Sequence, residues 1–202
     1  VKIMQSVIVT VSNNTKVKQG KAFSFTVSFD PQGTEIAGAQ TNMFFNNSAI
    51  NVNGVSEGDL FRQNARNTFF NSGTIDNSQG RVVNIFNAII GRYNVSTPGT
   101  FVTVNAISTG KAGTFQINLS NVKIASPEGE PILFSINNGS VRIYPAHDVT
   151  QDGVTDIRDL NEVGQHFSEE TSYSYPAYDI NEDGIVDIVD IVAVAQHFGE
   201  LT

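Results

Sequence analysis

The chain has 202 residues, 40% of them hydrophobic, which is enough for one or two domains with packed cores. It contains no cysteine, so disulfides and thiol chemistry are excluded. No apolar run approaches the roughly 20 residues that span a bilayer. The N-terminal stretch VKIMQSVIVTV has no signal-peptide cleavage site, so we expect a chain that does not include a secretion signal.

The net charge of −8 is divided unevenly along the chain. Residues 1–145 contain eleven Lys and Arg against seven Asp and Glu, a net charge of +4. Residues 146–202 contain one Arg against thirteen Asp and Glu, a net charge of −12. Such a segment repels itself unless cations neutralise it. The division predicts two domains, 1–145 and 146–202, and metal binding by the second.

The first domain has the pattern of an all-β fold. Runs rich in β-branched and aromatic residues alternate between apolar and polar positions, and Gly, Asn, Pro and Ser clusters separate them. In chain order, six of these runs are SVIVTVS (6–12), AFSFTVSF (22–29), RVVNIFNAII (81–90), GTFVTVNAI (99–107), GTFQINLSNVKIA (113–125) and GSVRIY (139–144). Strands at this spacing predict a mainly β protein, a nine-stranded jelly-roll β-sandwich without a helix.

After Pro145 the apolar residues change to helical spacing, which predicts a small α-helical domain behind the β-sandwich. These residues are Leu160, Val163 and Phe167 in one stretch and Ile191, Val194 and Phe198 in the other.

The helical stretches follow two nearly identical acidic segments. The 22 residues that begin at Asp148 and at Asp179 agree at eleven positions. Each segment places oxygen ligands at positions 1, 3, 5, 7, 9 and 12 and a glycine at position 6, the spacing of the EF-hand calcium loop. The predicted ligands of loop 1 (148–159) are Asp148, Thr150, Asp152, the Val154 carbonyl, Asp156 and Asp159. Those of loop 2 (179–190) are Asp179, Asn181, Asp183, the Ile185 carbonyl, Asp187 and Asp190.

Four carboxylates per loop favour Ca²⁺ over zinc or copper, so we expect two calcium ions, one in each loop. Thr150 is a poorer ligand than Asn181, and loop 1 is therefore expected to bind more weakly. An acidic, solvated turn is the alternative, but two copies with matching acids at position 12 favour the metal. No helix precedes either loop, so each is half of an EF-hand: a loop and its exit helix.

Duplicated loops with Asp at position 12 and only an exit helix resemble the dockerin module of cellulosome-type assemblies, over residues 147–200. The resemblance implies a helical surface that docks on a cohesin. The matching positions are Ile157, Arg158, Gly164 and Gln165 in the first copy and Ile188, Val189, Ala195 and Gln196 in the second. Most of these residues are apolar where the best-known dockerins have Ser, Thr, Lys or Arg, so the partner cannot be taken from that class.

The first domain in turn resembles a cohesin module over residues 4–144. The resemblance rests on four stretches in cohesin order, which are VKQGKAFSFTVSF, IAGAQTNMFFNNSAINVNGVSEGDLF, GRVVNIFNAII and NNGSVRIY. It implies a dockerin-binding sheet face to which Gly38, Gln40, Asn42, Phe86, Ala88 and Ile89 contribute. We place Val83 and Ile85 in the core and Phe86 outward; a shift of one residue would exchange the two faces.

Together, the two resemblances imply an adaptor that binds a dockerin-bearing protein through its first domain and a cohesin-bearing protein through its second. The linker PAH spans only about 10 Å, so head-to-tail self-association would join different chains. A carbohydrate-binding module with a calcium-stabilised C-terminal module is the alternative, because such modules share the sandwich fold. The absence of tryptophan favours the adaptor.

Enzymatic and nucleic-acid functions have little support. The three histidines, His147, His166 and His197, belong to no recognisable catalytic motif, and no glycine-rich phosphate loop is present. The acidic domain would repel phosphates. Five glycosylation sequons, at Asn13, Asn46, Asn94, Asn118 and Asn138, suit an extracellular or cell-surface protein.

Overall fold

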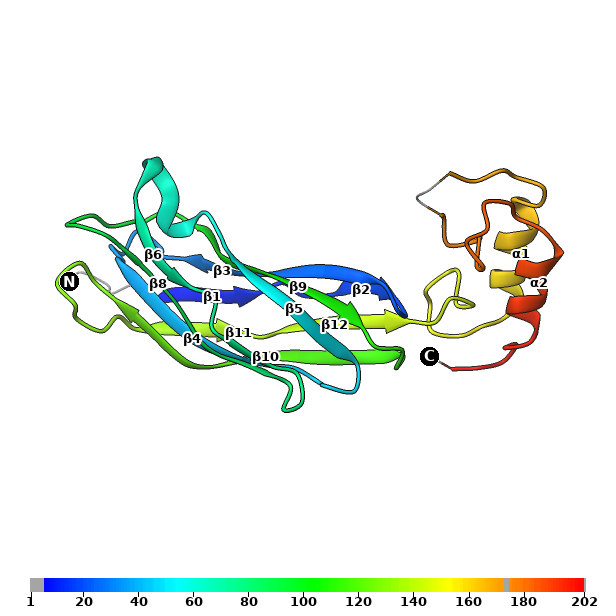
Figure 1. The fold of residues 1–202 in the computed structure, drawn as a ribbon, viewed down its shortest axis with the longest axis horizontal. Helices are drawn as coiled ribbons and strands as arrows, with labels where there is room; N and C mark the ends of the chain where they lie inside the picture. The colour runs from blue at the N-terminus through cyan, green and yellow to red at the C-terminus, as the bar shows by residue number, and fades with distance from the viewer. Residues whose placement is uncertain (1–5, 173–174, 202) are drawn as a thin grey trace. The chain divides into compact units, whose positions relative to one another are not determined.

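The computed structural model describes residues 6–172 and 175–201 (Figure 1). Contacts between Cα atoms divide the chain into two compact units, Val1–Arg142 and Ile143–Thr202. The division falls within strand β12 (Gly139–Tyr144), which belongs to a sheet of the first unit. We keep 1–145 and 146–202 as the proposed domain limits. None of the helices formed by the described residues has the length and apolar composition needed to cross a membrane.

The first unit is a β-sandwich of two sheets. One sheet has the order β11-β1-β3-β9-β5 (Phe134–Asn137, Val7–Val11, Ala22–Asp30, Gly99–Ser108 and Ile50–Glu57). The other has the order β2-β12-β10-β4-β8-β6 (Thr15–Lys18, Gly139–Tyr144, Gly113–Ala125, Gly38–Phe44, Arg81–Ile89 and Thr68–Asn71), and β7 (Thr74–Asp76) pairs with β8. The short 3₁₀ helix η1 (Leu60–Ala65) lies between β5 and β6. The predicted sandwich is confirmed, but the described residues form twelve strands rather than nine, because several segments of three or four residues pair as separate strands.

Strand alternation builds the core between the sheets. In β3, Phe25, Val27 and Phe29 are buried, while Thr26 and Ser28 between them are only partly buried. The ring of Phe29 packs against that of Phe101 from β9, with centroids 4.9 Å apart. The period of two in the sequence therefore indicates correctly which face of this strand is buried.

Strand β8 departs from that period because it contains a β-bulge. Thr41 and Met43 of β4 are two residues apart, but their partners Ile85 and Val82 are three apart, and Asn84 has the left-handed φ of 61°. The extra residue reverses the alternation, as expected at a bulge. The inward residues are therefore Val82 and Ile85, and the expectation that Val83 occupies the core was wrong.

The described residues of the second unit form two helices, α1 (Ile157–Gln165) and α2 (Ile188–Ala195). Their shared core consists of the buried residues Val149, Val163, Val186 and Val194, with Leu160, Ala177, Tyr178, Ile180 and Ile191 packed around it. The helical spacing of the sequence is confirmed for Val163 and Val194. Phe167 and Phe198, expected on the same apolar stripes, lie beyond the helix ends and are about half exposed.

Candidate metal centre and docking surfaces

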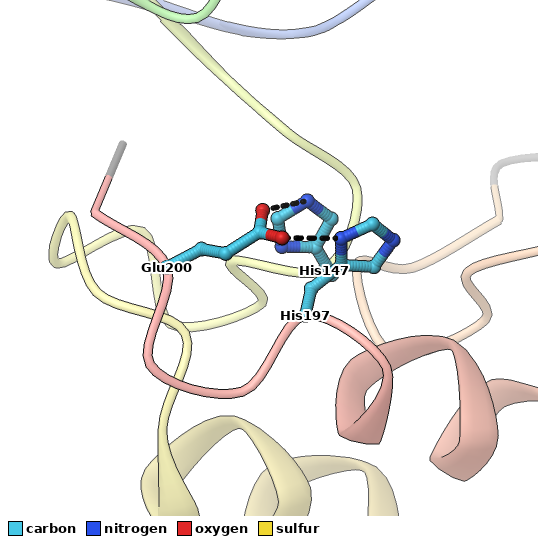
Figure 2. Close-up of side chains that lie close together, drawn as sticks. All are labelled: His147, His197 and Glu200. Atoms are coloured by element: carbon cyan, nitrogen blue, oxygen red, sulfur yellow. Dashed lines mark hydrogen bonds and ion pairs between the residues drawn. The ribbon is translucent and has the colours of Figure 1, made fainter.

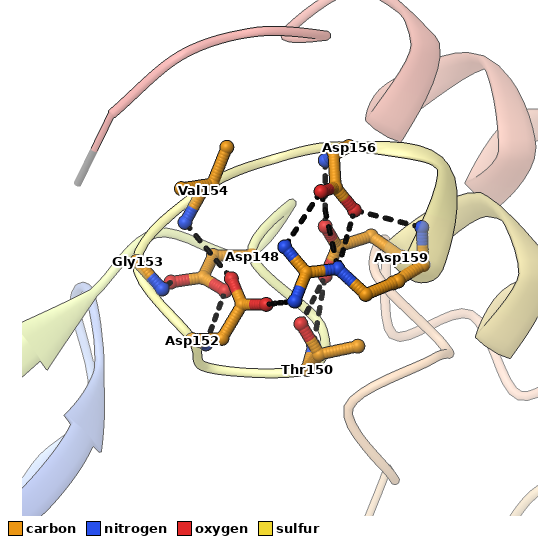
Figure 3. Close-up of polar contacts among 8 residues, drawn as sticks. Asp148, Thr150, Asp152, Gly153, Val154, Asp156 and Asp159 are labelled. Carbon is orange, nitrogen blue, oxygen red and sulfur yellow. Dashed lines mark hydrogen bonds and ion pairs between the residues drawn. The ribbon is translucent and has the colours of Figure 1, made fainter.

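The two acidic loops start their helices in the same way. Asp156 of loop 1 caps α1 by accepting a hydrogen bond from Arg158 N (2.8 Å), and Asp159 accepts one from Asp156 N (2.8 Å) (Figure 3). In loop 2 the corresponding distances, from Val189 N to Asp187 and from Asp187 N to Asp190, are 2.7 and 2.9 Å. This reciprocal capping box fixes the positions of both acids at the start of each helix.

The glycines at position 6 adopt the positive φ that the sharp turn of each loop requires. Gly153 has φ of 100° and Gly184 has φ of 93°, values that residues with a Cβ rarely adopt. Their amide groups donate to the acid at position 1, from Gly153 to Asp148 and from Gly184 to Asp179, at 3.2 Å in each loop. Both loops therefore wrap around the carboxylate at position 1.

The carboxylates at positions 1 and 12 are buried, and this burial fits a cation. Asp148, Asp159, Asp179 and Asp190 have no exposed surface. Within the described part of the chain, no hydrogen-bond donor contacts Oδ1 of Asp179, although this atom is buried. A buried, unpaired carboxylate oxygen costs free energy unless a positive charge lies beside it. Hard oxygen ligands of this kind suit Ca²⁺.

Loop 1 differs from loop 2 by having an internal cation. The guanidinium of Arg158 contacts Asp152 (Nη1 to Oδ2, 2.6 Å) and Asp156 (Nη2 to Oδ2, 2.7 Å), two of the predicted calcium ligands. Hydrogen bonding from Arg158 lowers the pKa of the Asp156 carboxyl. At the equivalent position loop 2 has Val189, so Asp183 and Asp187 have no such competitor there. Thr150 donates its hydroxyl to Asp159 at 3.0 Å.

All eight helix positions that the dockerin resemblance points to are exposed. The large apolar residues among them are Ile157, Ile188 and Val189, with 65%, 59% and 50% of their surface exposed. Val192 (43% exposed) extends the apolar stripe of α2 by one turn beyond Ile188. Sequence reasoning missed Val192, although its spacing of four from Ile188 was a signal for it. The docking role of these residues stays a prediction.

The predicted face of the sandwich contains an open groove of about 820 Å³ on β4, β8 and β10. Gly38, Gln40, Phe86 and Ala88 line it, as do Leu133 and Phe134 after β10. Exposed Phe69 of β6 extends this apolar surface by packing on Phe86, with ring centroids 5.7 Å apart. Phe69 and Leu133 were missed, because each belongs to a short segment whose place at this groove depends on the tertiary structure.

Two residues predicted for the docking face, Ile89 and Asn42, differ from the rest: Ile89 is buried, and Asn42 is hydrogen-bonded to the backbone of β8. Ile89 is only 8% exposed and points to the opposite side from Ala88, because consecutive strand residues face opposite ways. Its assignment to the docking face was wrong. Asn42 lies on the outward side with Gln40, and its Oδ1 accepts a hydrogen bond from Asn84 N (2.9 Å), which stabilises the β8 bulge.

Comparisons with known proteins agree with both resemblances. The cohesin domain family matches residues 7–143, and the dockerin type I domain family, whose members generally bind calcium, matches residues 146–199. No curated protein sequence matches the chain significantly.

Solved cohesin structures share the fold of the first unit. A non-cellulosomal cohesin from the archaeon Archaeoglobus fulgidus aligns with a TM-score of 0.54 and 17% identity, over 69% of this chain and 92% of that chain. A type I cohesin–dockerin complex from Clostridium thermocellum aligns with a TM-score of 0.57 and 19% identity, over 69% of this chain and 94% of that chain. A cohesin module of a family 33 glycoside hydrolase from Clostridium perfringens aligns with a TM-score of 0.57 and 19% identity, over 69% of this chain and 98% of that chain. At these identities the agreement is one of fold.

Proposed function

The chain belongs to the cohesin family through residues 7–143 and carries a type I dockerin domain at residues 146–199, and on this premise we propose that it is an extracellular adaptor assembled by calcium-dependent docking. Its first domain binds a dockerin-bearing protein, and its second binds a cohesin-bearing protein. Either partner can be a second copy of the chain, which would give head-to-tail assemblies.

The observation that carries this proposal is the exposed apolar surface on both units. The groove beside Phe86, Leu133 and Phe134 leaves aromatic and aliphatic side chains in water, as does the stripe of Ile188 and Val189 on α2. Contiguous apolar patches of this kind mark interaction sites on soluble proteins. The opposite net charges of the two domains favour fast association between such surfaces.

Two calcium ions, one in each loop, complete the second docking surface. The buried Asp179 and Asp190 of loop 2 and the buried Asp148 and Asp159 of loop 1 support this assignment. Because Thr150 replaces Asn181 and Arg158 contacts two ligands, we expect loop 1 to bind the weaker ion.

The matched families are non-catalytic interaction modules, which favours a role without enzymatic activity. The carbohydrate-binding alternative is less well supported. Flat sugar-binding faces usually present planar aromatic platforms, and this chain has no tryptophan.

The docking function can be tested with the full chain immobilised in calcium and exposed to panels of purified dockerin and cohesin modules. Phe86→Asp should abolish capture of dockerins while leaving capture of cohesins unchanged. Ile107→Asp is the matched control, because Ile107 is a partly exposed apolar residue of β9, in the other sheet. Retention on cellulose or chitin together with no capture of either module would instead support the carbohydrate-binding function.

A further inference from the structure

The second unit contains a group of three metal-ligating side chains outside the calcium-ligand sets. His147 precedes loop 1, whereas His197 and Glu200 follow α2, and one ligand atom from each lies within 4.8 Å of the other two. The imidazole rings stack with their centroids 3.9 Å apart and their planes at 7°. The Glu200 carboxylate faces both rings, with Oε1 3.1 Å from His197 Nδ1 and Oε2 3.8 Å from His147 Nε2 (Figure 2).

A buried hydroxyl orients His147 within this group. Thr155 has no exposed surface, and its Oγ1 lies 2.8 Å from Nδ1 of His147. When Nδ1 donates its proton to this oxygen, the lone pair is left on Nε2, on the side of Glu200. Histidines that bind metals usually have such a partner on the other ring nitrogen, which fixes both the tautomer and the ring orientation.

Backbone hydrogen bonds hold the three residues close together. Thr155 N donates to Glu200 O (3.0 Å), and Gly199 N donates to Thr155 O (2.7 Å), so the segment after α2 pairs with loop 1. Only 14% of the His147 side chain is exposed, compared with 42% for His197 and 55% for Glu200. The site therefore has one fixed ligand and two that can adjust.

The second copy provides an internal comparison. At the equivalent positions, 31 residues away in each case, Tyr178 replaces His147 and Val186 replaces Thr155. Tyr178 still stacks on His166, with centroids 3.7 Å apart, and Glu169 contacts both rings (2.6 Å to His166 Nδ1 and 3.2 Å to the Tyr178 hydroxyl). A stack capped by a carboxylate thus forms without a second histidine. The histidine at 147, together with the threonine that orients it, is an addition specific to the first copy.

We propose that His147, His197 and Glu200 bind one divalent transition-metal ion of the zinc type, separate from the calcium ions. Two imidazole nitrogens and a carboxylate oxygen are ligands that Zn²⁺ uses, whereas Ca²⁺ takes six to eight oxygens. Three protein ligands leave a fourth tetrahedral position for water. Parallel rings direct their lone pairs in parallel, so binding tilts one ring against the other until the lone pairs converge on the ion and the ligand atoms are about 3.3 Å apart, the spacing around tetrahedral zinc. The partly exposed His197 and Glu200 make this movement.

The ion would link residue 147, directly before loop 1, to the segment that closes the second unit. It would therefore stabilise this unit beyond what calcium provides, because it binds only the folded arrangement.

The test uses the full chain saturated with calcium and titrated with Zn²⁺ by isothermal calorimetry, with Co²⁺ absorption as a probe of four-coordinate geometry. The expected result is one equivalent of Zn²⁺ and a higher thermal midpoint for the second unit. His147→Tyr, which copies the residue of the other cluster and keeps an aromatic ring beside Glu200, should weaken zinc binding at least tenfold, in the range seen for disturbed metal sites. His166→Ala, in the Tyr178 cluster, is the matched control and should leave the affinity unchanged.

The absence of saturable zinc binding would overturn the proposal, as would equal zinc affinities of the wild type and His147→Tyr, or an equal loss in His166→Ala. Calcium-dependent helical circular dichroism shows whether each variant is folded. A gain of function complements these losses, because Tyr178→His combined with Val186→Thr should create a second zinc equivalent in the other cluster. The circular dichroism control applies to this variant too, since Val186 belongs to the buried core.

Discussion

The two copies in the second unit have nearly the same backbone but different side-chain chemistry. Both loops turn at a left-handed glycine, start a helix with an Asp–Asp capping box and bury their acids at positions 1 and 12. In the first copy, Arg158 occupies two predicted calcium ligands and Thr150 stands at position 3. In the second, Val189 and Asn181 take those places, and one buried oxygen of Asp179 has no hydrogen-bond partner among the residues that the structure describes.

This difference shows how a duplicated module can keep the residues for calcium binding in both copies while the outward-facing docking residues differ between them. Calcium binding depends on the conserved backbone and on buried acids, so both copies retain it as a predicted property. Residues that face outward from the same backbone are free to differ. The first copy is more polar, and Arg158 partly neutralises its loop, while α2 presents the more apolar stripe of Ile188, Val189 and Val192.

Chelation of calcium removes the feature that the two copies share and should have the largest effect. Without ions, the second unit has a net charge of −12 and four buried carboxylates, so we expect it to unfold, because metal binding is part of its folding. The first unit should stay folded. Circular dichroism and limited proteolysis with and without EDTA measure this, and an unchanged helical signal in EDTA would contradict the metal assignment.

Substitutions at position 1 of each loop should show which loop binds calcium more tightly. Asp179→Ala removes the carboxylate with the unpaired oxygen and should weaken calcium binding on the order of 100-fold, since ligand charge sets the affinity of such loops. Asp148→Ala should cost less, on the order of tenfold, because Arg158 already offsets charge in loop 1. Calcium titration of both variants by calorimetry tests this order, and a larger loss for Asp148→Ala would reverse the assignment of the weaker site.

Docking should distinguish the helices through a matched pair of isoleucines. Ile188→Asp disrupts an apolar neighbourhood formed with Val189 and Val192, and we expect about a 30-fold loss of affinity for a cohesin module, as for a hot-spot residue. Ile157 lies beside the charged Arg158, so Ile157→Asp should lower the affinity for the cohesin module only about threefold. Surface plasmon resonance with the same cohesin module makes the comparison. Equal losses would mean that both helices dock equally well.

The smallest effect should come from removing the internal cation of loop 1. Arg158→Ala frees Asp152 and Asp156 and should raise the calcium affinity of loop 1 by about two- to fivefold, the range expected for an exposed ion pair. The reciprocal change, Val189→Arg, should lower the affinity of loop 2 by a similar factor. Calcium titrations of the two variants should therefore shift in opposite directions, and a shift in the same direction would exclude competition by arginine.

Local patterns predicted much of the fold and the positions of the two acidic loops. The alternation of Phe25, Val27 and Phe29 indicates the buried face of β3, and the ligand spacing locates both loops because it depends on neighbouring residues alone. The bulge at Asn84 could not be located, because RVVNIFNAII offers both Val82 and Val83 for the same core position.

Contacts between distant residues were equally inaccessible to local patterns. His147 and His197 are 50 residues apart, and their stack follows from the pairing of the segment after α2 with loop 1. The grouping of Leu133 with Phe86 also requires the sheet to have formed.

That pairing connects the copies crosswise. The segment after α2 bonds to loop 1 through Thr155 and Glu200, and the segment after α1 bonds to loop 2 through Val186 and Glu169. Each loop thus forms backbone hydrogen bonds with the segment that follows the helix of the other copy. A single copy lacks the segment that pairs with its own loop. We therefore expect the two copies to fold only together, because separating them would leave two incomplete loops rather than one working site.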